Sequence, residues 1–471
     1  MGIAAGVFAS SGALRSAARQ SSRSERKLSS EWDQVPAILA RIKPPTFPNR
    51  EFDIRKFGAI GDNSADNTEA FRSAIAACAK AGGGRVLVPR GEFVTGAIEL
   101  KSNVNLNVAE GATIRFTHDT KKYPLVFTRW EGTECMNYSP FVYAWEQENI
   151  AITGKGTIDG NAGPEHWWPW KSTRPPGSKA DASSKPSDRE RLAEMAARGV
   201  PPRERIFGEG HYLRPQFIQP YRSRNILIEG VHLLNSPMWQ VTPCLCKNVT
   251  VRDLYINSSG PNTDGCDPES CSDVLIENCF FNTGDDCIAI KSGRNDDGRR
   301  VNVPAENIVI RGCHMKNGHG GVTVGSEISG GVRNVFAQDC EMNSPTLNIA
   351  LRIKNNAARG GLIEGIHARN ITVGEVSQAA ISIDFFYEEG EKGGHNPVVR
   401  NVSVERMTTA HSKYAVFLRG FKDDPIEDLK LSDCRFNGVT DGSVVENVAG
   451  IALKNVRVNG TEVERLGTTE A

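Results

Sequence analysis

Hydrophobic and polar residues alternate through the second half of the chain in a recurring unit of nine residues. Each unit begins with Asn or Asp, has mostly apolar residues at its second and fourth places, and has a polar or turn residue at its sixth. Such alternation indicates a strand with one buried face. The units are NILIEGVHL (225–233), NVTVRDLYI (248–256), DVLIENCFF (273–281), NIVIRGCHM (307–315), NVFAQDCEM (334–342), GIHARNITV (365–373, with Gly in the lead), NVSVERMTT (401–409) and DLKLSDCRF (428–436).

The spacing of these units predicts how the strands are arranged. The step from one unit to the next runs from 23 residues (Asn225 to Asn248) to 36 residues (Gly365 to Asn401). No helical period lies between the units, which excludes strand–helix–strand repeats. We therefore predict an all-β fold, a single-stranded parallel β-helix whose coils stack roughly 4.7–4.9 Å apart. The unequal steps predict loops of unequal length between coils.

The region before the repeat carries shorter signals. We expect strands at 52–57, 85–88, 97–100, 104–108 and 113–116. A helix over 67–81, with Asp66 or Asn67 as its N-cap, has one apolar face that includes Phe71 and Ile75. This helix would cap the first coil and cover its open edge.

The chain divides into two regions on these signals. Residues 1–45 form an N-terminal tail with a short helix at 32–42, and residues 46–471 form the β-helix domain. The apolar run near the start resembles part of a signal peptide but lacks a positive segment before it; we expect a secreted or periplasmic protein. An insertion at about 161–213, with a helix at 188–198, suits a wall or lid over a groove. Its tryptophans either stack on a sugar or anchor the insertion: Trp167, Trp168 and Trp170.

Charge and cysteine usage narrow the class of protein. Lys+Arg and Asp+Glu number 56 each, so the balance gives no steering toward nucleic acid or anionic membranes. No apolar run reaches the roughly 20 residues that span a bilayer. Cys279, Cys313, Cys340 and Cys434 all take the seventh place of their units, which indicates a buried column rather than a metal or redox site. The leading Asn residues are interpreted as turn residues whose side chains bond to the backbone.

Four acidic residues crowd into two Asn-, Asp- and Gly-rich turns: Asp264, Asp267, Asp285 and Asp286. Asp285 lies 12 residues after Asp273 and His319 lies 12 residues after Asn307, so these two occupy equivalent places on successive coils. Asp264 falls in the preceding coil. The coil after His319 carries Arg352 and, on the same face, Lys354. The register thus predicts a surface column in which carboxylates grade into a cationic patch.

This column suits hydrolysis of an acidic glycan. Glycosidic cleavage needs one carboxyl to protonate the leaving oxygen and a carboxylate to activate water or attack the sugar. Like charges in contact raise one pKa and keep a proton available. Arg352 and Lys354 would hold a substrate carboxylate. Taken alone, the Asp285–Asp286 pair also fits simple turn chemistry or calcium binding.

Four motifs in this order resemble the signature motifs of glycoside hydrolase family 28, the polygalacturonases: NTDGCD (262–267), GDD (284–286), GHG (318–320) and RIK (352–354). The segments FGAIGDNSADNTEAFRSAIAAC (57–78) and GKGTIDGN (154–161) are also similar to that family. The resemblance covers roughly residues 50 to 440. It implies a right-handed parallel β-helix and an inverting hydrolase without cofactor or metal.

The resemblance also implies roles for individual residues. Asp285 would be the general acid, and Asp264 and Asp286 would position and deprotonate water. His319 would tune the acid or bind substrate, and its presence favours homogalacturonan over a rhamnose-containing pectin. The remaining expected roles are an ordering role for Asn262, carboxylate binding for Arg352 and Lys354, and a substrate contact for Tyr387. Asp267 receives no role.

Chain-end (exo) action is expected from the run SGRNDDGRR (292–300) and the long insertion, which look like bacterial exo-acting members. Arg294, with Arg299 and Arg300, would hold a terminal carboxylate, or the run is a solvated loop. Endo action, a decorated pectin such as rhamnogalacturonan, a pectate lyase and a non-catalytic glycan-binding β-helix remain the alternatives. We expect a monomer acting on polygalacturonate.

One tension concerns stereochemistry. Inverting enzymes usually hold their carboxyl groups about 6.5–9.5 Å apart. Residues on adjacent coils would lie closer than that, which by the same rule predicts retention. We side with the resemblance and expect inversion, because two bases around one water do not need the usual gap.

Overall fold

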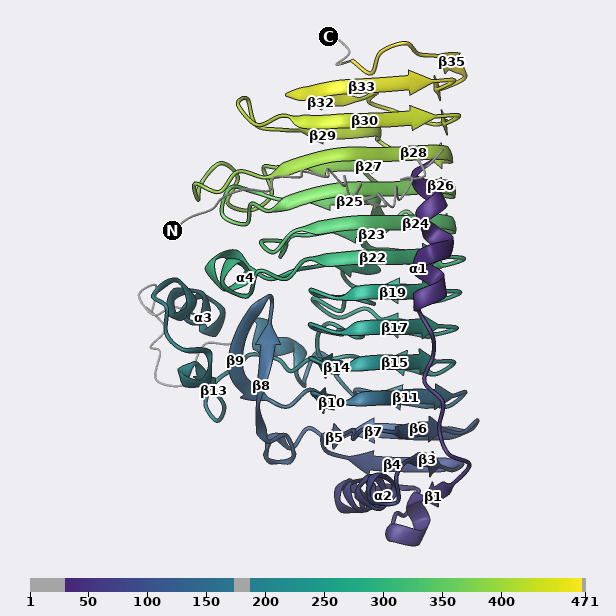
Figure 1. The fold of residues 1–471 in the computed structure, drawn as a ribbon, viewed down its shortest axis with the longest axis vertical. Coiled ribbons are helices and arrows are strands. Elements are labelled where there is room, and N and C mark those ends of the chain that lie inside the picture. Colours follow the sequence, from purple (N-terminus) through teal and green to yellow (C-terminus); the bar gives the residue numbers. More distant parts are fainter. Residues whose placement is uncertain (1–29, 173–186, 468–471) are drawn as a thin grey trace, which may run out of the picture.

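The chain winds into a stack of coils that runs the length of the molecule (Figure 1). The computed structural model describes residues 30–172 and 187–467. Successive coils pair in parallel, and their strands line up in three columns. The predicted right-handed parallel β-helix is confirmed.

The first column contains the leading strand of each coil. Its members are β1 (Glu51–Asp53), β3 (Gly84–Val88), β6 (Val104–Val108), β11 (Glu148–Gly154), β15 (Arg224–Glu229), β17 (Lys247–Arg252), β19 (Ser272–Glu277), β22 (Ala305–Arg311), β24 (Val332–Met342), β26 (Leu362–Glu375), β28 (Val398–His411), β30 (Ile426–Ser432) and β33 (Val448–Lys454).

The second column follows one turn later in each coil. Its members are β2 (Asp62–Asp66), β4 (Gly91–Thr95), β7 (Ala112–Phe116), β12 (Thr157–Asp159), β16 (His232–Leu234), β18 (Tyr255–Ser258), β20 (Phe280–Thr283), the start of β23 (His314–Val324), the ends of β24, β26 and β28, then β31 (Arg435–Phe436), β34 (Arg457–Val458) and β35 (Thr461–Glu462).

The third column bears the chemistry described below. It contains β5 (Ile98–Glu99), β10 (Val142–Trp145), β14 (Ile218–Tyr221), single bridges at Val241 and Cys266, β21 (Ile288–Ile290), the end of β23, β25 (Leu347–Lys354), β27 (Ala379–Asp384), β29 (Tyr414–Arg419) and β32 (Val444–Glu446).

The residues that lead the repeats are turn residues, as predicted, because they hold a left-handed backbone, with φ of 56° at Asn225 and 57° at Asn248. The predicted bonding of such a side chain to the backbone is present at Asn248, whose Oδ1 accepts from Lys43 N and whose Nδ2 donates to Lys43 O, both at 2.9 Å. The side chains also bond to one another along the stack. Asn225 Nδ2 donates to Asn149 Oδ1 at 2.9 Å, and Asn248 Nδ2 donates to Asn225 Oδ1 at 2.8 Å. Identical turns one coil apart place each amide directly above its equivalent, so the side chains satisfy one another.

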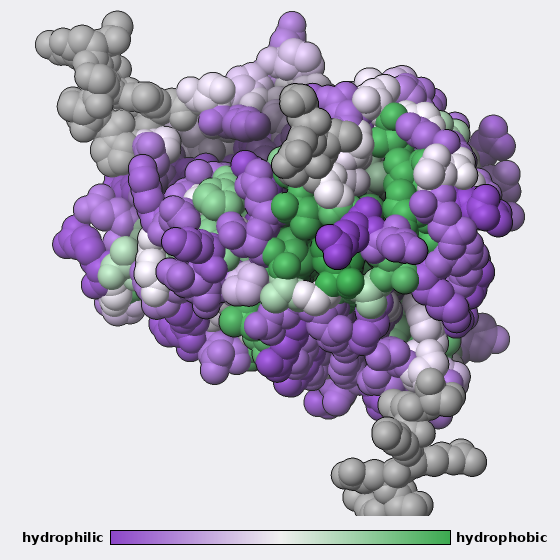
Figure 2. All heavy atoms as spheres, turned by 90° about the horizontal axis from the view of Figure 1, so that it is seen from above, coloured by the Kyte–Doolittle hydropathy of each residue, from purple (hydrophilic) through white to green (hydrophobic). Residues whose placement is uncertain are grey.

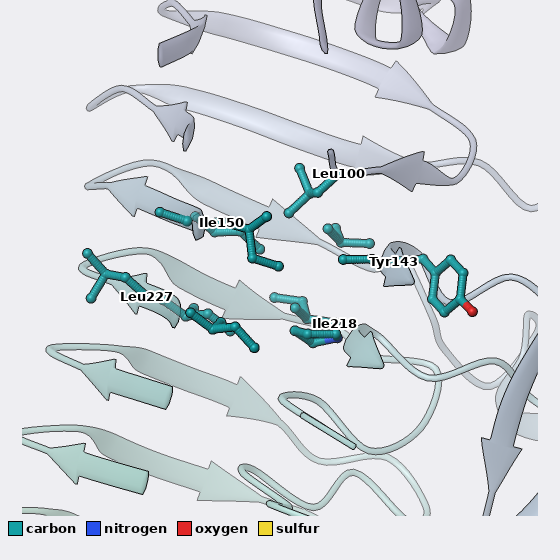
Figure 3. A pocket seen from close by; sticks show the side chains of 12 residues that line it. Leu100, Tyr143, Ile150, Ile218 and Leu227 are labelled. Carbon is teal, nitrogen blue, oxygen red and sulfur yellow. The ribbon is translucent and has the colours of Figure 1, made fainter. Parts of the chain in front are cut away.

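The interior of the stack is apolar. Cys313 lies between Cys279 and Cys340 on the neighbouring coils, and all eleven cysteines are buried and free. The predicted cysteine column is therefore confirmed. Figure 3 shows Leu100, Ile150 and Ile218 around a small void between coils. Its volume of about 10 Å³ leaves space for at most one water, so it belongs to core packing.

The two ends of the stack differ. Helix α2 (Thr68–Lys80) covers the first coils at one end of the stack, as predicted (Figure 1). It buries Phe71 and Ile75 against them. The strand expected at 52–57 is shorter than predicted, because Asp53 caps a 3₁₀ helix, η2 (Ile54–Phe57). At the other end, hydrophobic side chains gather between hydrophilic ones (Figure 2), where the last coils leave residues such as Ile451 only partly buried.

A side subdomain projects from the third column (Figure 1). It combines the predicted insertion with an earlier hairpin that was not predicted, β8 (Leu125–Trp130) and β9 (Thr133–Tyr138), which pairs with β13 (Ile206–Phe207). The expected helix at 188–198 is α3 (Asp188–Ala197), and α4 (Asn295–Val301) packs near it. The short 3₁₀ helices here are η3 (Thr120–Lys122), η4 (Trp168–Lys171) and η5 (Pro202–Glu204).

The segment from Ser30 to Lys43 lies along the outside of the first column (Figure 1). It contains η1 (Glu31–Gln34) and α1 (Val35–Arg41). Trp32 packs on Phe336, and Arg41 pairs with Asp273 at 2.6 Å. This segment, residues 30–43, is called the strap below, and it links the start of the described chain to coils more than 200 residues later. Within the described ranges, no helix is long and apolar enough to cross a membrane.

Candidate active site

A cleft of about 430 Å³ lies between the third column and the side subdomain. One wall comes from the β-helix and includes Asn262, Asp285, His319 and Tyr387. The opposite wall comes from the side subdomain and includes Trp130, Glu131, Trp170, Arg189 and Tyr212. The insertion thus forms the wall that its length predicts.

Three carboxylates meet at the floor of this cleft. Gly265 N donates to Asp286 O at 2.9 Å, which places Asp264 and Asp286 at equivalent positions on adjacent coils. Asp285 precedes Asp286 in the chain. One oxygen from each of the three lies within 4.8 Å of the others. Asp264 and Asp286 are buried, whereas Asp285 faces the cleft.

The next coil brings His319 to Asp285, as the equal spacing predicts. His319 N donates to Asp285 O at 3.2 Å, and His319 Nδ1 lies 2.9 Å from Asp285 Oδ1. Burial opposes ionisation of Asp285, but the hydrogen bond with His319 and the charge of Lys354 lower its pKa below the ordinary value. The same hydrogen bond raises the pKa of His319. In the free site, the proton of this pair therefore rests on the imidazole.

Two cationic side chains from a later coil contact the Asp286 carboxylate. Lys354 Nζ donates to Asp286 Oδ2 at 2.6 Å, and Arg352 Nη1 lies 3.4 Å from Asp286 Oδ1. Arg352 stands opposite Thr323, four residues after His319 along that coil. It reaches back over Gly320, where an added Cβ would lie 2.8 Å from Asp286 Oδ1. The glycine after His319 therefore makes room for this contact.

Asp264 has a buried counter-charge that the sequence analysis missed. Lys291 Nζ lies 3.7 Å from Asp264 Oδ2, 3.1 Å from Glu327 Oε2 and 4.0 Å from Asp267 Oδ2. Burial, together with the charges of Asp285 and Asp267, raises the pKa of Asp264 well above its ordinary value. The raised pKa expected of one carboxyl thus falls on Asp264, not on Asp285. Lys291 stands five residues after Asp286, a signal that the motifs alone do not show.

The remaining predicted contacts of the floor are also in place. Asn262 Nδ2 lies 3.4 Å from Asp285 Oδ2, and its Oδ1 accepts a bond of 2.7 Å from Arg214 Nη2. Arg214 is a buried residue that the sequence analysis missed, and burial lowers its pKa to about 10. The Tyr387 ring lies beneath two cations, with its centroid 5.5 Å from Arg352 Cζ and 5.2 Å from Lys354 Nζ.

The structure does not place the run 292–300 at the cleft surface. Arg294 lies among carboxylates, 3.0 Å from Glu131 Oε2 and 3.8 Å from Glu327 Oε1, and is not among the residues that line the cleft. Arg299 donates to backbone carbonyls, and Arg300 pairs with Asp297 at 3.0 Å. The run forms a helix, α4, rather than the loop considered as its alternative.

The tryptophans of the insertion divide between the two predicted roles. Trp167 is buried against Tyr123 and Phe141, and Trp168 Nε1 donates to Ser236 O at 2.9 Å. These two anchor the insertion to the β-helix. Trp170 packs on Trp167 but also lines the cleft.

The three carboxylates are close enough to hold a cation, which is the geometry that a calcium site would use. Ammonium groups already lie against two of them, because Lys354 bonds to Asp286 and Lys291 faces Asp264. Carboxylates with built-in counter-charges and a third that shares a proton with His319 suit acid–base chemistry better than metal binding.

Comparison with known proteins identifies the class of this site. The model of glycosyl hydrolases family 28 matches residues 208–459, which is more than half of the 471-residue chain and includes all four motifs. The chain belongs to glycosyl hydrolase family 28. This family 28 protein is therefore a glycoside hydrolase.

Similar proteins span bacteria and plants. The solved structure of a hyperthermoactive exopolygalacturonase from Thermotoga maritima is 45% identical, with a TM-score of 0.86, and the match covers 92% of this chain and 97% of that one. The exo-poly-alpha-D-galacturonosidase of Dickeya chrysanthemi is 26% identical over 87% of this chain and 74% of its own. A probable polygalacturonase of Vitis vinifera is 29% identical over 80% of this chain and 72% of its own.

Proposed function

We propose that this family 28 hydrolase cleaves α-1,4 galacturonosyl linkages of polygalacturonate from the chain end, with inversion. The observation that carries the proposal is the joining of three carboxylates, the Asp285–His319 pair and the Arg352–Lys354 pair on one face of a cleft. Carboxylates supply acid–base catalysis, and the cations supply recognition of a uronate.

Asp285 is the proposed general acid, acting together with His319. In the free site the proton rests on His319, 2.9 Å from Asp285. A sugar that fills the cleft excludes water, and a drier site favours the neutral pair over separated charges. The proton then lies on Asp285, which gives it to the glycosidic oxygen as that bond breaks.

Asp264 and Asp286 are the proposed bases, holding one water between them. The water attacks the anomeric carbon and gives its proton to one of these carboxylates. Arg352 and Lys354 bind the carboxylate of the galacturonate at the cleavage site, and Tyr387 contacts the sugar beside them. Asn262 keeps Asp285 in place. For Arg294, we propose that it holds the cleft-lining Glu131 rather than touching sugar.

Chain-end action is supported by the side subdomain, which walls one side of the cleft with bulky residues such as Trp130 and Trp170. Relatives named as exo-acting enzymes include those of Thermotoga maritima and Dickeya chrysanthemi. Chromatography of a polygalacturonate digest tests this. Release of monomer from the first time point supports exo action, whereas a ladder of oligomers would indicate endo action. Activity only on a rhamnose-containing or otherwise decorated pectin would mean that polygalacturonate is not the substrate.

A lyase is the second candidate, favoured by the cation-sized spacing of the three carboxylates. A lyase would release an unsaturated uronate that absorbs ultraviolet light, whereas a hydrolase releases reducing ends without that absorbance. A non-catalytic glycan-binding protein would do neither. We also propose that the protein is secreted or exported to the periplasm, because a substrate polymer of this kind lies outside the cell. Cell fractionation tests this location. We propose that the protein acts as a monomer, which light scattering tests.

A further inference from the structure

A buried group of charges lies behind Asp264, on the side away from the cleft; it consists of Lys291, Asp267 and Glu327 and is called the charge layer below. Lys291 is buried, and its ammonium faces Asp264, Asp267 and Glu327 at 3.7, 4.0 and 3.1 Å. Gly325 O accepts a bond of 3.4 Å from Nζ, and the Trp239 ring covers another side with its centroid at 4.2 Å. Asp285, Asp286 and the buried Glu269 also interact with the Lys291 charge, and the Lys354 ammonium lies against Asp286. A buried ammonium is expensive to desolvate, so this one needs carboxylates around it.

Glu327 alone satisfies the structural need for a counter-ion. It makes the shortest contact with Lys291 and is also 3.8 Å from Arg294. Despite burial, these cations lower the pKa of Glu327, so it carries a full negative charge. If Lys291 served only to neutralise Glu327, Asp264 and Asp267 would not need to lie against the same ammonium.

Asp267 is the unexplained member of this layer. It is fully buried, and neither of its side-chain oxygens has a hydrogen-bond partner among the described residues. Asp264 Oδ1 likewise has none. A buried carboxyl left without hydrogen bonds is unfavourable for folding, and such a group requires an explanation. Asp267 lies three residues after Asp264 on the same coil, and the Lys291 ammonium faces both carboxyl groups.

We propose that Lys291 and Asp267 are positioning residues that set the charge of Asp264 from below, Lys291 favouring its ionised form and Asp267 opposing it. The inference rests on the proposed role of Asp264 as a base. Lys291 offsets part of the rise that burial, Asp285 and Asp267 impose on the pKa of Asp264. Removing either residue should therefore move the pH at which Asp264 can act as a base.

The two residues predict opposite effects on the pH profile. Lys291→Met removes the positive charge, so Asp264 ionises only at higher pH, and the acid limb of kcat/KM moves up by about one pH unit or more. Asp267→Asn removes, at nearly constant shape, the carboxyl that opposes ionisation of Asp264, so the acid limb moves down. Lys316→Met, at an exposed position of β23, is the matched control and leaves the limb in place.

A purely structural role for the layer predicts a different result. Both variants would then lower activity or the melting temperature at every pH, with the acid limb unmoved, and that outcome would overturn the proposal. The proposal would also be overturned if the acid limbs of Lys291→Met and Asp267→Asn moved in the same direction. Asp267→Asn serves as the independent test if Lys291→Met fails to fold.

The direct readout is independent of the proposed reaction. Infrared spectroscopy during a pH titration detects the band of a protonated carboxyl group. The band of Asp264 is identified as the one that is missing in Asp264→Asn. The proposal expects this band to persist to higher pH in Lys291→Met and to vanish at lower pH in Asp267→Asn. An unshifted band refutes it even if polygalacturonate is hydrolysed. Shifted bands in a protein that does not hydrolyse polygalacturonate would support the charge layer and refute the proposed function.

Discussion

His319 Nδ1 lies 2.9 Å from Asp285 Oδ1, and the two residues occupy equivalent positions on adjacent coils. The pair holds one proton. Because the pKa of His319 is raised, the imidazole keeps this proton at pH values at which an ordinary histidine would lose it. The proton is lost as the pH rises through that raised pKa. The alkaline limb of the activity profile should therefore report His319, although Asp285 delivers the proton.

Replacing His319 with Ala should move this alkaline limb to lower pH, because Asp285 must then retain the proton alone. We expect kcat/KM near neutral pH to fall about 100-fold. His319→Gln is the informative companion variant, since it keeps a hydrogen-bond donor but cannot titrate. A pH profile of kcat/KM for the three proteins checks this. An alkaline limb that stays in place in both variants would mean that His319 does not hold the proton.

Gly320→Ala should reduce activity by about 100-fold and lower the free energy of unfolding by about 1–3 kcal/mol. The added Cβ would lie 2.2 Å from Thr323 Oγ1 and 2.8 Å from Asp286 Oδ1, which displaces a proposed base. Gly163→Ala is the matched control, because nothing lies within 4 Å of its added Cβ. Steady-state kinetics and melting curves of both variants check this. Equal activity in the two variants would contradict the proposed place of Asp286.

Lys354→Met should lower kcat/KM about 100-fold and raise KM as well. Lys354 is the buried partner of Asp286, at 2.6 Å, and its loss leaves that carboxylate without its closest counter-charge. It also removes one of the two proposed contacts to the substrate carboxylate. Lys413→Met, at an exposed lysine of the same stack, should change neither parameter. An unchanged KM for polygalacturonate in Lys354→Met would argue against substrate binding by Lys354.

Trp32→Ala should destabilise the fold by about 3 kcal/mol without changing kcat. Trp32 packs its ring against Phe336, and Arg369 Cζ lies 4.0 Å from the ring centroid on the other side. Urea unfolding measures the difference. Ile60→Ala, at an exposed position, is the control and should change the free energy of unfolding by less than about 0.5 kcal/mol. A small effect of Trp32→Ala would mean that the strap does not stabilise the stack.

The repeat register and the four motifs predict much of the fold and the floor of the site. Asp285 and His319 lie together because their coils have equal offsets from the leading residue, which is a property of spacing alone. Arg352 lies on the coil that the sequence predicts, but its contact with Asp286 depends on Gly320, which lets its side chain reach back. Side-chain reach of this kind is not encoded in strand periodicity.

Other features depend on contacts between segments distant in sequence. Lys291 ends an ordinary apolar strand, and only the stacking of three coils brings it against Asp264 and Glu327. The β8–β9 hairpin pairs with β13 70 residues later (Met136 with Ile206), so neither segment predicts the sheet by itself. Arg294 was expected to meet sugar, but the carboxylate of Glu131 on that hairpin lies against it.

The stereochemistry of the product tests the central claim most directly. One oxygen from each of the three carboxylates lies within 4.8 Å of the others, closer than the separation usual for inversion. Inversion is nevertheless expected when two bases hold one attacking water. Proton NMR of polygalacturonate during its first minutes of digestion reports the anomer released. The account predicts free galacturonate that appears first as the β-anomer and then mutarotates. First release of the α-anomer would show retention and contradict the proposed roles of Asp264 and Asp286.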